Sequence, residues 1–143
     1  MRLVLDTHIY VDALRSDAGA ETLGRLEEIG RFVWLNAVVA HELMIGVHRM
    51  RGRGREEAVI RPFIDRGRIL TPSFDAWQRS GQAIAALHAR GRIDERRVPK
   101  SFANDLLIAA SCAEESVTLV TRNARDFALI AEEIPFQFIP PWT

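Results

Sequence analysis

The sequence predicts an α/β fold in which helices cover both faces of a mainly parallel sheet. Short apolar runs at Met1–Leu5, Phe32–Leu35 and Val117–Val120 are typical of buried strands, and longer segments with helical spacing separate them. Strands that alternate with helices favour a parallel sheet, since each parallel pair needs a crossover connection. At 143 residues the chain is expected to form one domain, residues 1–143.

The spacing of apolar residues predicts further elements between these strands. Asn36 is the expected N-cap of one helix, and Gly91 is the expected stop of another. Two Arg-rich segments, Arg49–Arg55 and Arg90–Ser101, are expected to be exposed. Helices are predicted at Thr22–Ile29, Ala37–Met50, Phe74–Arg90 and Phe102–Glu115, and two more strands at Ile69–Leu70 and Phe136–Ile139.

The composition is that of a soluble globular protein, with 48% hydrophobic and 27% charged residues. The formal net charge is zero, so the molecule as a whole has no field that attracts nucleic acid. The single Cys112 excludes an internal disulfide and a cysteine zinc site. No signal peptide and no apolar run of membrane-spanning length are apparent, so we expect a cytoplasmic protein.

Acidic residues follow the predicted strands. Asp6 ends the first strand, Glu42 lies in the helix after the second, and Asn123 and Asp126 come soon after Val117–Val120. Asp105 is expected in the first turn of its helix, inside the apolar run SFANDLLIAA. Ligands of open parallel sheets collect beyond the carboxyl ends of the strands. These acids are therefore expected to converge at one edge of the sheet.

Convergence of carboxylates requires a counter-ion. Two carboxylates ~5 Å apart repel by about 3 kcal/mol at an effective dielectric constant of about 20. Oxygen ligands without cysteine favour hard cations such as Mg²⁺ or Mn²⁺. In phosphodiester hydrolysis such an ion lowers the pKa of a bound water and stabilises charge on the phosphate. The acid set therefore predicts a metal-dependent phosphodiesterase.

Each acid also has a structural interpretation when taken alone. An Asp at a strand end is often a helix cap or a turn former, and Asp105 in a first turn would favour the helix dipole. Glu42, between His41 and Leu43, is compatible with a surface position. The functional interpretation depends on the whole set, in this order and on these elements.

Four segments resemble the signature segments of PIN-domain ribonucleases. They occur in the family's order, and the resemblance covers nearly the whole chain. The compact size is most similar to VapC-like toxins of type II toxin–antitoxin systems. The segments are LVLDTHIYVDAL, AVVAHELMIGV, FANDLLIAAS and LVTRNARDF.

The resemblance implies a three-layer α/β/α sandwich with a Mg²⁺- or Mn²⁺-dependent endoribonuclease site. Asp6, Glu42 and Asp105 match the three core acidic positions and are the expected metal ligands. The fourth position stays open between Asn123, which offers a carbonyl oxygen but no charge, and Asp126, the fourth candidate catalytic acid.

Residues around the acids and the partners follow from the same resemblance. Thr7 and Thr121 are expected to orient the acids by hydrogen bonding, with Asn123 as a further supporting residue. His8 departs from the Asn or Ser that is more usual in the family. The implied partners are an RNA substrate, a cognate antitoxin and a second copy of the chain in a homodimer.

The run RMRGRGR is a candidate RNA-binding segment. Its arginines could contact RNA phosphates, form a solvated loop or dock an antitoxin segment, and the sequence does not separate these roles. The loop Arg90–Ser101 carries mixed charge and is a weaker candidate for guiding substrate. The arginines of the run are Arg49, Arg51, Arg53 and Arg55.

Two other functions compete with the nuclease. A haloacid-dehalogenase-type phosphatase or a receiver domain is disfavoured, because His8 stands where the phosphatase needs a second Asp and Lys100 precedes a helix instead of following a strand. A catalytically inactive PIN-like module that binds RNA or protein is supported by Asn123 at the fourth position. Metal titration separates this module from an enzyme.

Overall fold

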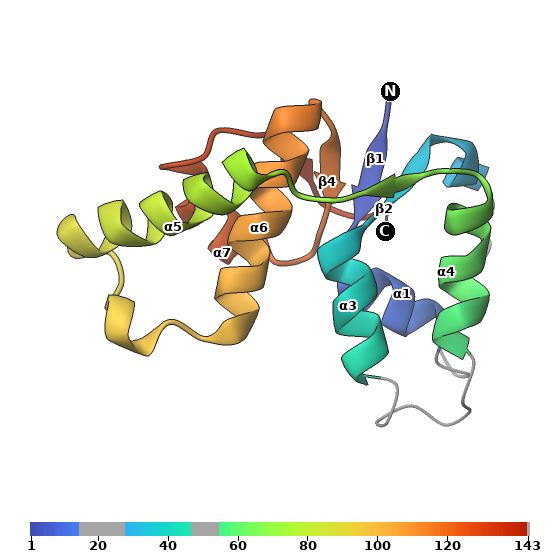
Figure 1. Cartoon of the computed structure of the whole chain (residues 1–143), viewed down its shortest axis with the longest axis horizontal. Helices are drawn as coiled ribbons and strands as arrows, with labels where there is room; N and C mark the ends of the chain where they lie inside the picture. Colours follow the sequence, from blue (N-terminus) through green and yellow to red (C-terminus); the bar gives the residue numbers. More distant parts are fainter. Residues whose placement is uncertain (15–27, 47–54, 143) are drawn as a thin grey trace.

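The computed structural model describes residues 1–14, 28–46 and 55–142. Within these residues five strands form one parallel sheet in the order β3-β2-β1-β4-β5 (Figure 1). The strands are β1 (Leu3–Leu5), β2 (Val33–Asn36), β3 (Ile69–Leu70), β4 (Thr118–Val120) and β5 (Phe138–Ile139).

Six α-helices and two short 3₁₀ helices of the described residues surround this sheet. In Figure 1, α5, α6 and α7 lie on one side of β1 and β4, and α1, α3 and α4 lie on the other. The helices are α1 (Thr7–Leu14), η1 (Gly30–Phe32), α3 (Ala37–Gly46), α4 (Arg55–Asp65), α5 (Phe74–Ala89), η3 (Glu95–Arg97), α6 (Lys100–Glu115) and α7 (Ala124–Ala131). The fold is a three-layer α/β/α sandwich, as predicted.

The strand order contains a switch point beside β1. The chain proceeds outward from β1 to β2 and β3, and then returns to add β4 and β5 on the other side of β1. Right-handed crossovers in opposite directions place helices on opposite faces. A crevice forms at the carboxyl ends of strands where the order reverses, and here these ends belong to β1 and β4.

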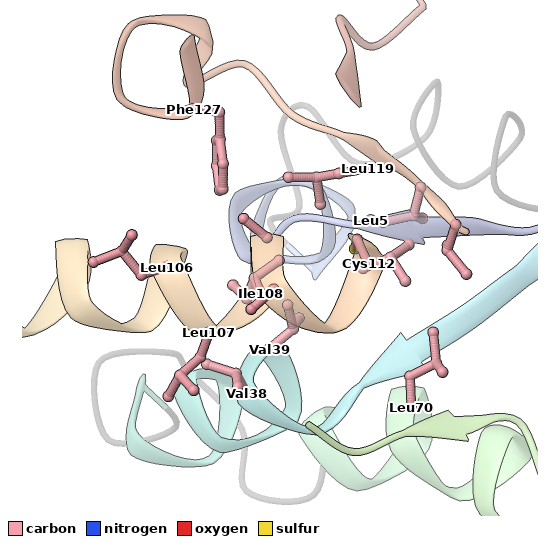
Figure 2. Packing of buried hydrophobic residues seen from close by; sticks show 14 of the residues in the cluster. Leu5, Val38, Val39, Leu70, Leu106, Leu107, Ile108, Cys112, Leu119 and Phe127 are labelled. Atoms are coloured by element: carbon pink, nitrogen blue, oxygen red, sulfur yellow. The ribbon is translucent and has the colours of Figure 1, made fainter. Parts of the chain in front are cut away.

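Helix α6 is the centre of the hydrophobic core. Leu106, Ile108 and Cys112 of this helix have no exposed surface, and they belong to the same hydrophobic core as Leu5 of β1 and Leu119 of β4 (Figure 2). Burial of each such side chain contributes roughly 1.5–3 kcal/mol. The core therefore holds α6 against the sheet. This packing also fixes the position of Asp105, the acidic residue in the apolar run of α6.

The predicted strands are confirmed, with ends that shift by one or two residues. The helix predicted over Ala37–Met50 is confirmed as α3 as far as Gly46, and its last four residues lie outside the described residues. The helix predicted over Phe74–Arg90 is confirmed as α5, and Gly91 ends it with φ +71°. Asn36 is confirmed as a cap, because its Oδ1 accepts a hydrogen bond from the Val38 amide at 2.9 Å. The helix predicted at Thr22–Ile29 falls almost entirely outside the described residues.

The helix predicted at roughly Phe102–Glu115 is confirmed as α6, but it begins two residues earlier, and the prediction that Asp105 lies in its first turn was wrong. The helix begins at Lys100 because Pro99, extended at ψ 147°, serves as the N-cap and its carbonyl accepts from Ala103 N at 3.1 Å. Asp105 consequently lies beyond the first turn, which contains no acidic residue. A helix-dipole role at the first turn therefore does not account for this carboxylate.

Helices α1, α4 and α7 were not predicted from the apolar spacing. Helices α1 and α7 have only 8 residues each, and α4 contains Pro62, a residue that normally argues against a helix interior. None of the helices in the described ranges is long and apolar enough to cross a membrane.

Candidate active site

Asp6 lies at the switch point, directly after β1. Its amide donates to the Val120 carbonyl at 2.9 Å, which continues the sheet pairing to the end of β4. The Thr7 amide donates to Asp6 Oδ1 at 2.8 Å, and Thr121 Oγ1 donates to Asp6 Oδ2 at 2.6 Å. The residue is 3% exposed. Two neutral donors thus fix both oxygens of a buried carboxylate.

Glu42 reaches the same edge from α3. Thr7 Oγ1 donates to Glu42 Oε1 at 2.7 Å, while the Thr7 amide donates to Asp6. Thr7 therefore joins two acids that are 36 positions apart in the sequence, one through its backbone and one through its side chain. The structure places Thr7 and Thr121 in the hydrogen-bonding positions expected of them.

The surroundings of Asp105 raise its pKa strongly. The residue is 8% exposed, and burial raises its pKa to about 8, with further contributions from the charges of Asp6, Glu42 and Asp126. The hydrogen bond from Asn123 Nδ2, at 3.3 Å, acts in the opposite direction. Asp6, Glu42 and Asp126 thus lie near enough to Asp105 to disfavour its ionised form.

Asn123 connects Asp105 with Asp126. Its Nδ2 donates to Asp105 Oδ2 at 3.3 Å and to Asp126 Oδ2 at 3.1 Å, and its amide donates to Thr121 Oγ1 at 3.0 Å. Asn123 thus presents an N–H group to the acids, while Asp126, in the first turn of α7, adds a charge.

No Arg or Lys of the described residues forms an ion pair with Asp6, Glu42, Asp105 or Asp126; pairs such as Arg122–Asp12 lie elsewhere. The nearest cationic candidate is His8, whose Nε2 lies 3.5 Å from Asp6 Oδ2 and is buried without a hydrogen-bond partner in the described part of the chain. Clustered carboxylates without a cation are unfavourable.

The donor set fits a hard divalent cation in its chemistry. The four acids offer oxygen ligands, and the charges of Asp6, Glu42 and Asp126 help to raise the pKa of Asp105, an effect that a bound cation would reverse. Among the described residues, no three His, Cys, Asp or Glu side chains are arranged to hold an ion as they stand. The carboxylates would therefore have to draw together around a bound ion.

Comparison with known proteins identifies the fold family. The family model described as PIN domain matches residues 3–133. The chain belongs to the PIN domain family. This PIN domain is 27% identical over 144 residues to Ribonuclease VapC2 of Rickettsia felis (strain ATCC VR-1525 / URRWXCal2), covering 99% of this chain and 98% of that protein.

Solved structures resemble this PIN domain over its full length. The crystal structure of VapBC2 from Rickettsia felis, bound to a DNA fragment from its promoter, has a TM-score of 0.70 at 25% identity and covers 100% of both chains. FitAcB from Neisseria gonorrhoeae has a TM-score of 0.71 at 22% identity, covers 98% of both chains and supports the fold alone.

Sequence reasoning missed one buried polar contact of the PIN domain. Asn36 Nδ2 donates to Ser111 Oγ at 2.6 Å, and Ser111 Oγ donates to the Ile108 carbonyl at 2.9 Å. Ser111 ends the segment FANDLLIAAS, and a polar residue at the end of an apolar run was the available signal. The contact joins the start of α3, which carries Glu42, to the C-terminal half of α6.

Most of the predicted RNA-binding arginines lie outside the residues that the structure describes. Arg49, Arg51 and Arg53 lie outside those residues, and Arg55 is the first residue of α4. Their role stays a prediction.

Proposed function

We propose that this PIN domain is a metal-dependent endoribonuclease that acts as the toxin of a toxin–antitoxin pair. The observation that carries the proposal is the group of acids at the switch point, in which Asp6 and Asp105 are buried and Glu42 and Asp126 are half-buried. This group lacks an Arg or Lys partner among the described residues, and the pKa of its Asp105 is raised to about 8. Similarity to Ribonuclease VapC2 supports RNA as the substrate.

Asp6, Glu42 and Asp105 are the proposed ligands of Mg²⁺ or Mn²⁺, and Asp126 is the proposed fourth acid. When bound, the cation supplies an activated water and neutralises charge on the scissile phosphate. Thr7 and Thr121 hold Asp6 in place through hydrogen bonds at 2.8 and 2.6 Å. The side-chain Nδ2 of Asn123 donates to both Asp105 and Asp126 and so keeps the two acids together.

The proposed partners follow from the similar complexes. Besides VapBC2 from Rickettsia felis, a toxin–antitoxin complex from Klebsiella pneumoniae has a similar structure. We propose that a cognate antitoxin binds this chain, that the chain forms a homodimer, and that it acts in the cytoplasm. The arginines of residues 49–55 remain the proposed contacts to RNA phosphates.

The test is cleavage of total RNA by purified protein with Mg²⁺, with Mn²⁺ and with chelator, followed by sequencing of the RNA ends. Wild type is expected to cut only with metal, and Asp105→Asn and Asp6→Ala are expected to be inactive. Asp75→Asn, which alters an exposed carboxylate on α5, is the matched control and should retain activity. Equal activity of wild type and folded Asp105→Asn would overturn the proposal.

The same experiment decides the competing function. A catalytically inactive module would cut no RNA with either metal while still binding RNA or a protein partner. Such a module should also bind Mn²⁺ weakly or not at all.

A further inference from the structure

A cavity lies beside the acid cluster, between the start of α6 and helix α7. Its volume is about 270 Å³, which is just below the roughly 300–1,000 Å³ of drug-sized sites and leaves room for a small group such as one nucleobase. Asp126 contributes to its lining and is hydrogen-bonded through Asn123 to Asp105. The other lining residues are Ile93, Asp94, Arg97, Val98, Pro99, Ser101, Phe102 and Leu129.

The lining combines apolar walls with a few polar groups. Phe102, Val98 and Leu129 offer surfaces that a flat ring could contact on its faces. Ser101 and Asp94 offer a hydroxyl and a carboxylate that a ring could contact at its edge. Sequence-specific RNA recognition uses this combination, because unstacked bases are held by their faces and read at their edges.

The Asp94 carboxylate has one oxygen available for a ligand. Its Oδ1 accepts from Arg96 N at 3.0 Å and from Arg96 Nε at 3.4 Å, which holds the side chain in place. Its Oδ2 forms an ion pair with Arg97 Nε at 3.9 Å, which is beyond hydrogen-bonding distance, and it accepts no hydrogen bond from the residues that the structure describes. A carboxylate oxygen accepts from amino groups, as Asp and Glu do from cytosine N4.

We infer that this cavity binds the base next to the scissile phosphate of the RNA, and that it prefers bases with an exocyclic amino group over uracil. The inference rests on the proposed function for its substrate class. Because Asp126 belongs both to the cavity lining and to the acid cluster, a base in the cavity would lie beside the cleaved bond. The Arg97 side chain, 87% exposed at the cavity, is positioned for an adjoining phosphate.

The first experiment measures binding without catalysis. Cytidine, adenosine, guanosine, uridine and ribose are each titrated into ¹⁵N-labelled full-length protein in chelator. Amides of Ser101, Phe102 and Leu129 are expected to shift with the three amino-bearing nucleosides, less with uridine and not with ribose. Absence of these shifts, or equal shifts with ribose, overturns the inference and leaves the ribonuclease proposal intact.

The second experiment measures the base preference of cleavage. RNA ends made by wild type are expected to show a bias against uracil on one side of the cut. Asp94→Asn keeps an oxygen for the Arg96 amide but loses the carboxylate, and it should reduce the bias about tenfold. Asp75→Asn, which lies outside the cavity lining, should leave the bias unchanged.

The outcomes separate the two proposals. Nucleoside shifts without RNA cleavage would overturn the ribonuclease and the position beside a scissile phosphate, and would retain the cavity as a nucleobase site. Cleavage without base bias, or an unchanged bias in Asp94→Asn, would overturn the base site alone. If nucleosides cause no shift and Asp94→Asn instead weakens binding of a protein partner, the cavity is a protein contact and the inference fails.

Discussion

Asn36 and Ser111 form a buried hydrogen bond of 2.6 Å between two residues with no exposed surface. Asn36 also caps α3 through the Val38 amide, and Ser111 lies 6 positions after Asp105 on α6. The helix of Glu42 is therefore fixed to the helix of Asp105 by a side-chain contact that does not itself include an acid.

Ser111→Ala is expected to destabilise the protein. It leaves Asn36 Nδ2 buried without an acceptor, which costs about 1–3 kcal/mol in the free energy of unfolding. Urea unfolding followed by circular dichroism measures this loss. Ser80→Ala is the matched control, because Ser80 is also buried but its hydroxyl donates only within its own helix, to the Trp77 carbonyl. Equal losses in the two variants would contradict a special role for the Asn36–Ser111 contact.

Asp105→Asn is expected to stabilise the metal-free protein at neutral and alkaline pH. The pKa of Asp105 is raised from 3.8 to about 8, so between these values the folded chain holds a proton that the unfolded chain releases. The free energy of unfolding therefore falls as pH rises through this range. Thermal melting in chelator should show that the difference between variant and wild type grows from pH 4 to pH 8. A difference independent of pH would contradict the prediction.

Added Mn²⁺ is expected to raise the melting temperature of wild type. An ion bound only by the folded state stabilises it by about 2.7 kcal/mol at a hundredfold excess over Kd. Asp105→Asn should lose most of the shift, since it removes a charged ligand, whereas the surface variant Asp75→Asn should keep it. Calorimetric scans with and without Mn²⁺ measure both. The metal proposal would be wrong if wild type showed no shift at millimolar Mn²⁺.

Thr121→Val is expected to lower metal affinity or RNA cleavage by about 10–100-fold. The substitution keeps the side-chain shape but removes the hydroxyl that donates to Asp6 Oδ2. Thr118→Val is the control, because Thr118 begins β4, the strand that Thr121 directly follows, and its hydroxyl donates to Gln137 at the surface. Comparing Mn²⁺ titrations and cleavage rates of the two variants tests the effect. Similar losses in both would indicate a general effect on β4.

The strands were predictable because β1, β2 and β4 are short, apolar and bounded by polar residues. Once these strands are parallel, Asp6 and Thr121 must share an edge, so the grouping of the acids also followed from sequence. The helix containing Asp105 was recognised, but its start depends on Pro99, which acts as an N-cap without a side-chain hydrogen bond.

Other features depend on contacts between distant segments. The donation of Asn123 Nδ2 to both Asp105 and Asp126 requires the relative placement of α6 and α7. The Asn36–Ser111 contact likewise spans 75 positions, and no local pattern specifies it. Local periodicity therefore indicates which residues meet at the edge, but not which atoms bond.

The connection between α5 and α6 is tied to the end of α7 by arginines. Arg90 pairs with Glu132 and Glu133, and Arg92 pairs with Glu132 at 2.8 Å. The cavity has walls from both segments, with Asp94 and Val98 on one and Leu129 on the other. These exposed pairs weaken as ionic strength rises. The width of the cavity is therefore expected to change with salt concentration. Discrimination among bases should change with it, even when RNA concentration is adjusted so that the same fraction of protein is bound.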